Sequence, residues 1–188
     1  HFLLAQKSQI TVFDERSEHE FDTNKLDEYK NKNVQFIFGA FPQLSQYSTI
    51  FRSPGVPLSK AVIIDAAKKG SVITSATKLF FEKSPAKIIG VTGTKGKGTT
   101  STLIYEMLKE QGLHVFLGGN IGTPPLDFLD KLTPESWVVL ELSSFQLFDL
   151  EKSPHVAVVL MVVPEHLDWH KDAHEYKNAK YNIARFQN

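Results

Sequence analysis

The chain has 188 residues, of which 41% are apolar and 22% charged, so it can hold one large domain or two small ones. Its 21 basic and 21 acidic side chains balance, and the absence of a long basic stripe argues against nucleic acid as a partner. The lack of cysteine excludes disulfide frameworks and thiolate metal sites. No signal peptide is visible, and the longest apolar run, 156–163, is far shorter than the roughly 18 residues of a membrane span. We therefore expect a cytoplasmic protein without a membrane partner.

The first part of the chain predicts short strands and helices between polar loops. The pattern indicates, in chain order, the tail of a helix over 1–7, a strand over 9–13, a loop with one short helix over 17–32, a strand over 33–39, a rigid turn over 53–57, a helix over 60–69 and a strand over 71–74.

A new unit begins near Pro85, where strands and helices alternate regularly. The pattern predicts strands over 87–92, 114–117, 137–142 and 155–163, and helices over 99–111, 124–131 and 172–186. Strands that are almost entirely Val, Ile and Leu, alternating with helices, indicate an α/β fold with a parallel sheet covered on both faces. We therefore expect two domains, 1–84 and 85–188.

A glycine-rich segment, Gly90–Thr100, lies between a predicted strand and a predicted helix. Its glycines let backbone N–H groups converge on a phosphate, because side chains there would block close approach. Lys97 can neutralise phosphate charge, and Thr99 or Thr100 can hold Mg²⁺ through a hydroxyl group. The residues assigned to ATP or GTP binding are Gly93, Thr94, Lys95, Gly96, Lys97, Gly98, Thr99 and Thr100.

This segment departs from the strict phosphate-loop template at two positions. Val91 lies six residues before Lys97, where the template has glycine, and Gly98 follows Lys97 in place of serine or threonine. A glycine-rich turn without a ligand is the alternative interpretation. The combination of lysines, glycines and hydroxyl groups exceeds what a turn requires, and favours phosphate binding.

Polar side chains at two other strand ends complete a candidate metal site. Glu141 ends one apolar strand, and His166 and Asp168 follow another. In a parallel sheet these positions lie at the ligand-binding edge, and Mg²⁺ bridging phosphates needs one or two such partners. Glu141 could instead be a solvated or capping carboxylate, His166 could satisfy local hydrogen bonds, and Asp168 could cap a turn. Burying an acid at a strand end is costly without a cation, which favours the metal site.

Together these residues resemble the Mur ligase family, and within it the branch that adds D-glutamate. The segments that carry the resemblance are Asp14–Arg16, Ser53–Val56, Gly90–Thr100, Gly119–Gly122, Leu140–Leu147, Pro164–Asp168 and Tyr176–Lys180. The resemblance implies a small Rossmann-like N-terminal domain that binds a UDP-linked substrate, followed by a P-loop-type ATP-binding central domain. Both are expected to be incomplete, because the chain starts inside an apolar pattern and ends inside a predicted helix.

The resemblance also implies a reaction. An ATP-dependent, ADP-forming ligase would phosphorylate the carboxylate of UDP-N-acetylmuramoyl-L-alanine, and the amine of D-glutamate would attack the acyl phosphate, in peptidoglycan precursor synthesis. ATP and Mg²⁺ are the implied cofactors, both substrates are small molecules, and we expect a monomer. Without the family's C-terminal domain, which holds D-glutamate, we expect residues 1–188 alone to be inactive.

The same resemblance assigns roles to individual residues. Lys97 would clamp the ATP phosphates, Thr99 with Glu141 would hold one Mg²⁺, and His166 would bind a second metal. Lys180, which spacing alone would make a solvated lysine, would be carbamylated and support the metal site. The residues implied to contact the substrate are Asn120 and Ser144 at the muramoyl group and Asp14 and Arg16 at the uracil.

Two alternatives remain open, and a third is disfavoured. Gly98 after Lys97 resembles the loop of folylpolyglutamate synthase, so another Mur or folylpolyglutamate-type ligase is one alternative, and the threonine that holds the metal stays undecided. A nucleotide-binding module without catalysis is the second. A GTPase switch is the third, but it requires a guanine-reading Asn-Lys-x-Asp motif, which the sequence lacks.

Overall fold

The computed structural model describes residues 2–187, which form two compact units. The first contains the residues up to Ile50 together with Leu58–Ile73, and the second contains Phe51–Pro57 and the residues from Thr74 onward. The second unit thus takes in residues that precede the predicted domain boundary between 84 and 85. The outermost residues of the two predicted domains, His1 and Asn188, lie outside the described part of the chain.

The elements up to Thr74 are short. They are α1 (Phe2–Ala5), β1 (Thr11–Asp14), the 3₁₀ turn η1 (Glu18–Glu20), α2 (Thr23–Lys30), β2 (Gln35–Phe38), β3 (Thr49–Phe51), α3 (Ala61–Lys68) and β4 (Val72–Thr74). All but the last residues of β3 and β4 belong to the first unit. These elements follow the sequence pattern except for β3, which was not predicted. Helix α2 begins after Asp22, whose carboxylate accepts a hydrogen bond from the Lys25 amide. Strands β1 and β2 are parallel, with Asp14 opposite Phe38, and β3 pairs with β4 in a second sheet.

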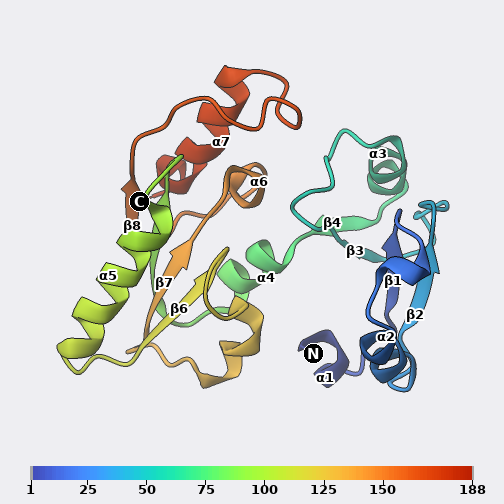
Figure 1. Cartoon of the computed structure of the whole chain (residues 1–188), viewed down its shortest axis with the longest axis horizontal. Helices are drawn as coiled ribbons and strands as arrows, with labels where there is room; N and C mark the ends of the chain where they lie inside the picture. Colours follow the sequence, from blue (N-terminus) through green and yellow to red (C-terminus); the bar gives the residue numbers. More distant parts are fainter. Residues whose placement is uncertain (1, 188) are drawn as a thin grey trace. The chain divides into compact units, whose positions relative to one another are not determined.

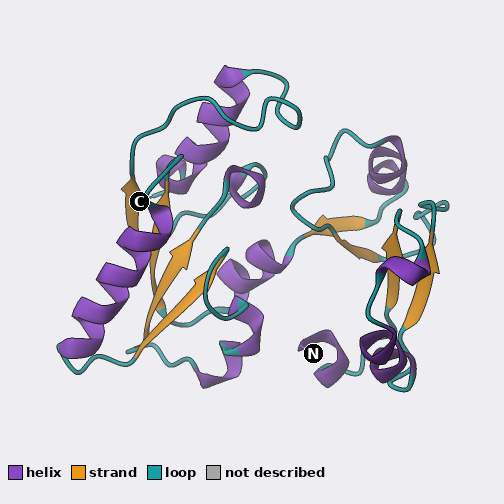
Figure 2. Ribbon diagram, in the orientation of Figure 1, coloured by secondary structure: helices purple, strands orange, loops and turns teal. Residues whose placement is uncertain are grey.

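The second unit is built on a four-stranded parallel sheet, which confirms the predicted α/β class. Its elements are α4 (Ala76–Lys83), β5 (Lys87–Thr92), α5 (Lys97–Glu110), β6 (Val115–Gly119), η2 (Pro125–Asp127), η3 (Leu129–Lys131), β7 (Trp137–Glu141), α6 (Ser144–Leu147), β8 (Val156–Val159) and α7 (Ala173–Arg185). The strand order is β6-β7-β5-β8, and Figure 2 shows strands of this sheet beside its helices. All four strands therefore end at one edge of the sheet, where the predicted site residues follow them.

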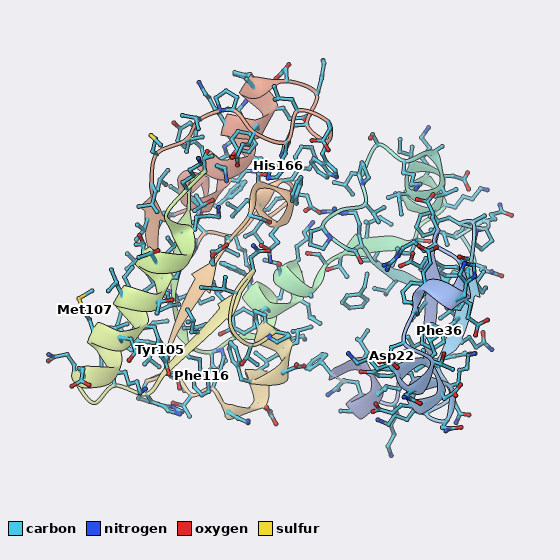
Figure 3. The ribbon with its side chains drawn as sticks, viewed as in Figure 1. Asp22, Phe36, Tyr105, Met107, Phe116 and His166 are labelled. Atoms are coloured by element: carbon cyan, nitrogen blue, oxygen red, sulfur yellow. The ribbon has the colours of Figure 1, made fainter. Side chains whose placement is uncertain are left out.

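Helices cover both faces of this sheet. Figure 1 shows α5 running along β5, β6 and β7. On the opposite face, Gly90 lies against α7, because a Cβ atom at Gly90 would lie 3.1 Å from Ile183 Cδ1 and 2.8 Å from Pro154 Cγ. Phe128 fills the same face further along, 5.0 Å from the ring of Phe116, which Figure 3 labels. The buried, apolar strands are thus explained by coverage on both sides.

Three predicted elements differ from the structure. Helix α5 begins at Lys97, two residues earlier than predicted, because Gly96 caps it. The helix predicted over 124–131 is two 3₁₀ turns, η2 and η3, separated at Phe128, whose φ of −122° interrupts a helix. The strand predicted over 155–163 ends at Val159 because its partner β5 ends at Thr92; beyond it the chain bonds to the phosphate loop. Helices α4 and α6 were not predicted.

Candidate functional site

The loop between β5 and α5 has the backbone shape of a phosphate cradle. Gly93 and Gly96 have φ values of +147° and +84°, which favour glycine. A Cβ atom at Gly93 would lie only 2.7 Å from Leu160 Cβ, so no other residue fits there without a shift. Gly96 is followed directly by the first turn of α5, whose free N–H groups and helix dipole favour a bound anion.

Thr94 turns its side chain into the protein. Its hydroxyl lies 2.8 Å from the Val163 carbonyl oxygen and 3.0 Å from the Tyr176 hydroxyl, and it accepts a hydrogen bond from the Val163 amide at 2.9 Å. The Thr94 amide donates to the Met161 carbonyl. Thr94 therefore fastens the loop to α7 and to the chain after β8, and its hydroxyl and its backbone amide are both bonded within the protein.

Lys97 lies over the loop that it follows. Its ammonium group donates to the Thr94 carbonyl at 3.0 Å, and the side chain is half-buried. This hydrogen bond holds the Lys97 ammonium group beside the loop between β5 and α5. A bound phosphate could replace the Thr94 carbonyl as its partner there. Lys95 and Thr99 are exposed, and Thr100 is half-buried in the first turn of α5.

Glu141 is a buried carboxylate at the end of β7, with 4% of its surface exposed. The Asn120 side-chain amide donates to its Oε1 at 3.1 Å, and the Asn120 backbone amide donates to its carbonyl at 2.9 Å. The other oxygen, Oε2, lies 3.3 Å from where a Cβ atom of Gly98 would be. Gly98 thus lets the carboxylate approach the start of α5. Asn120 holds Glu141, and its predicted contact with the substrate stays a prediction.

Lys180 lies beneath the phosphate loop and is almost completely buried. Its ammonium group donates to the Gly93 carbonyl at 2.7 Å. Desolvation, and secondarily the nearby charge of Lys97, lower the Lys180 pKa to about 8, although Glu165 and Glu141 act in the opposite direction. The structure thus brings together three of the predicted catalytic groups, Lys97, Glu141 and Lys180.

His166 lies on an exposed segment between β8 and α7. Its ring is 4.9 Å from that of Phe145 in α6 and 6.4 Å from that of Tyr176 in α7, and Figure 3 labels it beside these helices. Its φ of +55° is unusual for a residue other than glycine, and such strain is often found at functional sites. The contacts of the His166 ring are with these aromatic side chains, and its predicted metal role stays a prediction.

Ser144, a predicted substrate contact, is buried at the start of α6. Its hydroxyl lies 3.0 Å from Nε2 of His170, which is also buried. Burial lowers the pKa of His170 despite the opposing charge of Glu175. The neutral imidazole therefore orients the serine hydroxyl within the protein, and the substrate contact of Ser144 is left untested.

Residues 2–187 contain no group of three His, Cys, Asp or Glu side chains that could hold a metal ion alone. A Mg²⁺ ion bound with a nucleotide takes one or two protein carboxylates and completes its shell with phosphate oxygens and water. Glu141 Oε2, beside the first turn of α5, has the chemistry for such a site. Asp168 is exposed on the loop after His166.

In the first unit, Asp14 and Arg16 form a planar ion pair just after β1. The Arg16 Nε and Nη2 atoms donate to the two oxygens of the Asp14 carboxylate, each at 3.0 Å. These hydrogen bonds lower the pKa of Asp14, and the guanidinium group stacks 4.3 Å from the ring centre of Phe21. Both residues lie at the carboxyl end of β1, the edge at which parallel sheets bind ligands.

Four residues at or near the site escaped the sequence analysis. Glu165 acts on Lys180 through its charge, His170 holds Ser144, and Trp169 and Arg52 bond to the turn at 53–57. Glu165 lies within the segment Pro164–Asp168, and Trp169 follows it directly. This position beside His166 is the only sign in the sequence that they lie near the site. The bonds of Arg52 are set by tertiary structure and leave no sequence pattern.

Comparison with known proteins assigns both parts of the chain to one family. The description "Mur ligase middle domain" matches residues 91–188, and "Mur ligase MurD-like, N-terminal domain" matches residues 1–75. Proteins named UDP-N-acetylmuramoylalanine--D-glutamate ligase are 42% identical in Clostridium acetobutylicum and 44% identical in Clostridium kluyveri, over 100% and 99% of this chain. The chain spans 41% of the length of each of these two relatives.

A solved structure has the same fold at much lower sequence identity. The UDP-N-acetylmuramate:L-alanyl-gamma-D-glutamyl-meso-diaminopimelate ligase of Neisseria meningitides matches 98% of this chain, and 62% of its own chain, with a TM-score of 0.56 and 15% identity. Within residues 2–187, no helix is long and apolar enough to cross a membrane.

Proposed function

Because this chain belongs to the Mur ligase family, we propose that it is part of an ATP-dependent ligase that joins D-glutamate to UDP-N-acetylmuramoyl-L-alanine. The relatives that carry this name match the chain from end to end, and the Leu140–Leu147 segment has the pattern typical of the D-glutamate branch. The single observation that carries the proposal is the gathering of Lys97, Lys180 and Glu141 around the phosphate loop.

The phosphate loop supports the ATP half of the reaction. The first turn of α5 would receive the phosphates on its N–H groups, and Lys97 would exchange the Thr94 carbonyl for a phosphate oxygen. In-line phosphoryl transfer demands positioning and charge neutralisation more than covalent help from the protein. The loop is suited to this because Thr94 and Lys180 already fix its backbone from below.

Glu141, with Thr99 or Thr100, would hold Mg²⁺, and His166 would reach a second ion. The metal would supply charge neutralisation at the transferring phosphate. Glu141 fits this role because Asn120 fixes its Oε1, which leaves Oε2 directed at the start of α5. Gly98 contributes space, and a side chain at that position would crowd the carboxylate.

Lys180 would be carbamylated, which converts a buried cation into an anion beside the metal site. The reaction of an amine with CO₂ requires the neutral form, and a pKa of about 8 leaves an appreciable fraction of Lys180 neutral near physiological pH. A carbamate would also remove the repulsion between the charges of Lys180 and Lys97.

Four polar residues would contact the UDP-linked substrate. The protein would act in the cytoplasm. Asp14 and Arg16 would face the uracil, and Asn120 and Ser144 the muramoyl group. The carboxylate of the alanine unit would become an acyl phosphate, which the D-glutamate amine attacks to give the amide, ADP and phosphate. We expect the protein to act as a monomer.

The test is phosphate release by the protein at its natural full length. We expect release that needs ATP, UDP-N-acetylmuramoyl-L-alanine and D-glutamate together, and that falls by at least about a hundredfold in Lys97→Met, because a phosphate-binding charge is lost. Lys109→Met is the control, since Lys109 is exposed at the far end of the same helix. Release that proceeds equally without D-glutamate, or with another amino acid in its place, would disprove the assignment.

A further inference from the structure

The turn at Ser53–Val56 belongs by sequence to the N-terminal domain, yet it packs as part of the second unit. The Val56 amide donates to the Ser53 carbonyl at 2.9 Å, which closes a turn with Pro54 and Gly55 at its centre. Just before it, the Arg52 amide donates to the Thr74 carbonyl at 2.8 Å. The position of this turn is therefore set by contacts within the second unit.

Arg52 is the residue that holds the turn in shape. Its side chain is 1% exposed, and its Nη1 atom donates to the carbonyl oxygens of Ser53, Pro54 and Val56 at 3.3, 3.1 and 2.8 Å. The chain thus curls around a buried guanidinium group, which gathers three backbone carbonyls at one nitrogen. The carbonyl of Gly55 is bonded separately, to the indole Nε1 of Trp169 at 3.0 Å.

Asp149 connects this guanidinium group to the ATP-binding sheet. Its Oδ1 accepts from Arg52 Nη2 at 2.9 Å, and its Oδ2 lies 3.4 Å from the ammonium group of Lys78 in α4. Asp149 follows α6, the helix that starts at Ser144, three residues after Glu141 at the end of β7. A charge-assisted pair in this buried setting is held firmly, because separating it would leave a charge without a partner.

The turn leaves polar groups free on its outer side. All four of its carbonyls are bonded inward, whereas Ser53 and Gly55 are exposed. Within residues 2–187 the Gly55 amide has no hydrogen-bond partner. The turn therefore presents donors, an amide and a hydroxyl, which suit the oxygen-rich part of a nucleotide-linked sugar.

We propose that Arg52 and Asp149 form a clamp that positions the Ser53–Val56 turn, and through it the UDP-linked substrate, relative to the phosphate loop. The part that concerns the substrate rests on the proposed function. Neither side chain needs to touch the substrate, because Arg52 acts through the backbone of the turn and Asp149 acts through Arg52. Both are positioning residues.

The clamp is tested by hydrogen exchange in Arg52→Met and Asp149→Asn. We expect peptides covering residues 51–57 to exchange at least about tenfold faster, because the turn loses the contacts that order it, while β5 and β7 stay unchanged. The controls are Lys152→Met and Glu151→Gln, which remove the same charges from exposed neighbouring positions. Unchanged exchange at the turn, or a uniform rise throughout the second unit, would overturn the clamp.

Arg52→Lys keeps the test decisive if Arg52→Met fails to fold. A lysine retains the buried positive charge opposite Asp149 but lacks the planar fork that serves the carbonyls and the carboxylate together. We expect exchange at the turn to lie between the wild-type and Asp149→Asn rates. Exchange identical to wild type would show that the fork is not needed and would contradict the proposal.

Kinetics at natural full length test the link to the substrate. We expect Asp149→Asn to raise KM for UDP-N-acetylmuramoyl-L-alanine about tenfold while KM for ATP stays within about twofold. An equal rise in both constants, or none, would overturn the substrate role. If the wild type shows no D-glutamate-dependent turnover, the proposed function fails, whereas the exchange experiment still decides whether the clamp exists.

Discussion

At the scale of single residues, side chains that point into the protein decide what the phosphate loop leaves free for a ligand. Thr94 stands in the middle of the glycine-rich motif, and its residue type alone suggests contact with phosphate. The structure instead bonds its hydroxyl to Val163 and Tyr176. Sequence could place Thr94 in the loop but could not give the direction of its side chain, because both partners are distant in the chain.

Thr94→Val should therefore act on stability. Valine has the same shape but leaves the buried Tyr176 hydroxyl and the part-buried Val163 amide without this partner. A buried polar group that loses its partner costs about 1–3 kcal/mol. We expect the free energy of unfolding to fall by about 2–4 kcal/mol, measured by urea denaturation. Thr102→Val on the exposed side of α5 is the control and should change it by less than about 0.5 kcal/mol. Equal effects of the two changes would contradict this account.

Lys180 makes stability depend on pH in an unusual direction. Its pKa is about 8 in the folded protein and 10.5 in the absence of that environment. Between these values the unfolded chain binds more protons than the folded protein, so the free energy of unfolding increases as the pH rises. Below about pH 8 Lys180 is charged in the folded protein, and the free energy of unfolding is lowered by the full cost of burying that charge.

The comparison is with Lys180→Met, which cannot titrate at this position. From pH 8 to 10.5 the free energy of unfolding of the wild type, minus that of the variant, should increase by on the order of 1 kcal/mol per pH unit. Thermal or urea unfolding at several pH values measures this difference. The buffers exclude CO₂ and bicarbonate, so that Lys180 stays a free amine. A difference that stays flat or decreases across the same range would then show that the Lys180 pKa is not lowered.

At the scale of elements, strands and long helices were predictable because their hydrophobic pattern reflects coverage by the sheet and helices around them. Two short helices, α4 and α6, were not predicted. Helix α6 has only four residues, too few to show a helical period. Helix α4 has a recognisable cap, Ser75, whose hydroxyl accepts from the Lys78 amide, but its apolar pair Phe80 and Phe81 resembles a strand.

Gly119 shows where a strand end requires glycine. Its φ is +100°, and a Cβ atom there would lie 2.2 Å from the Glu141 carbonyl oxygen, a backbone atom that cannot move away cheaply. Gly112 also has a positive φ, +75°, but has open space around it. A substitution at Gly112 therefore measures the cost of the backbone conformation alone. A substitution at Gly119 measures that cost together with the cost of the close approach to Glu141.

We expect Gly119→Ala to lower the free energy of unfolding by more than about 3 kcal/mol, because β6 and β7 must separate where Glu141 ends its strand. Gly112→Ala should cost only about 1 kcal/mol, the price of the left-handed conformation alone. Circular dichroism during thermal unfolding measures both. Similar melting temperatures for the two variants would argue against the close approach at Gly119.

At the scale of the whole molecule, the sequence could predict the fold class and the glycine-rich loop between a strand and a helix. It could also predict that Lys97 and Glu141 lie at the same edge of the sheet, because the ends of parallel strands meet there. It could not predict that the Ser53–Val56 turn packs with the second unit. That assignment depends on Arg52 and Asp149, which are 97 residues apart and belong to no motif.

The central claim is that the chain takes part in activating a carboxylate by phosphorylation, and ¹⁸O tracing tests it most directly. UDP-N-acetylmuramoyl-L-alanine labelled with ¹⁸O in its free carboxylate would be turned over with ATP and D-glutamate by the protein at its natural full length. An acyl phosphate keeps one carboxylate oxygen on the departing phosphate, so we predict one ¹⁸O atom in each phosphate released, detected by mass spectrometry. Phosphate without the label would mean that ATP is hydrolysed by water and would contradict the proposed ligase chemistry.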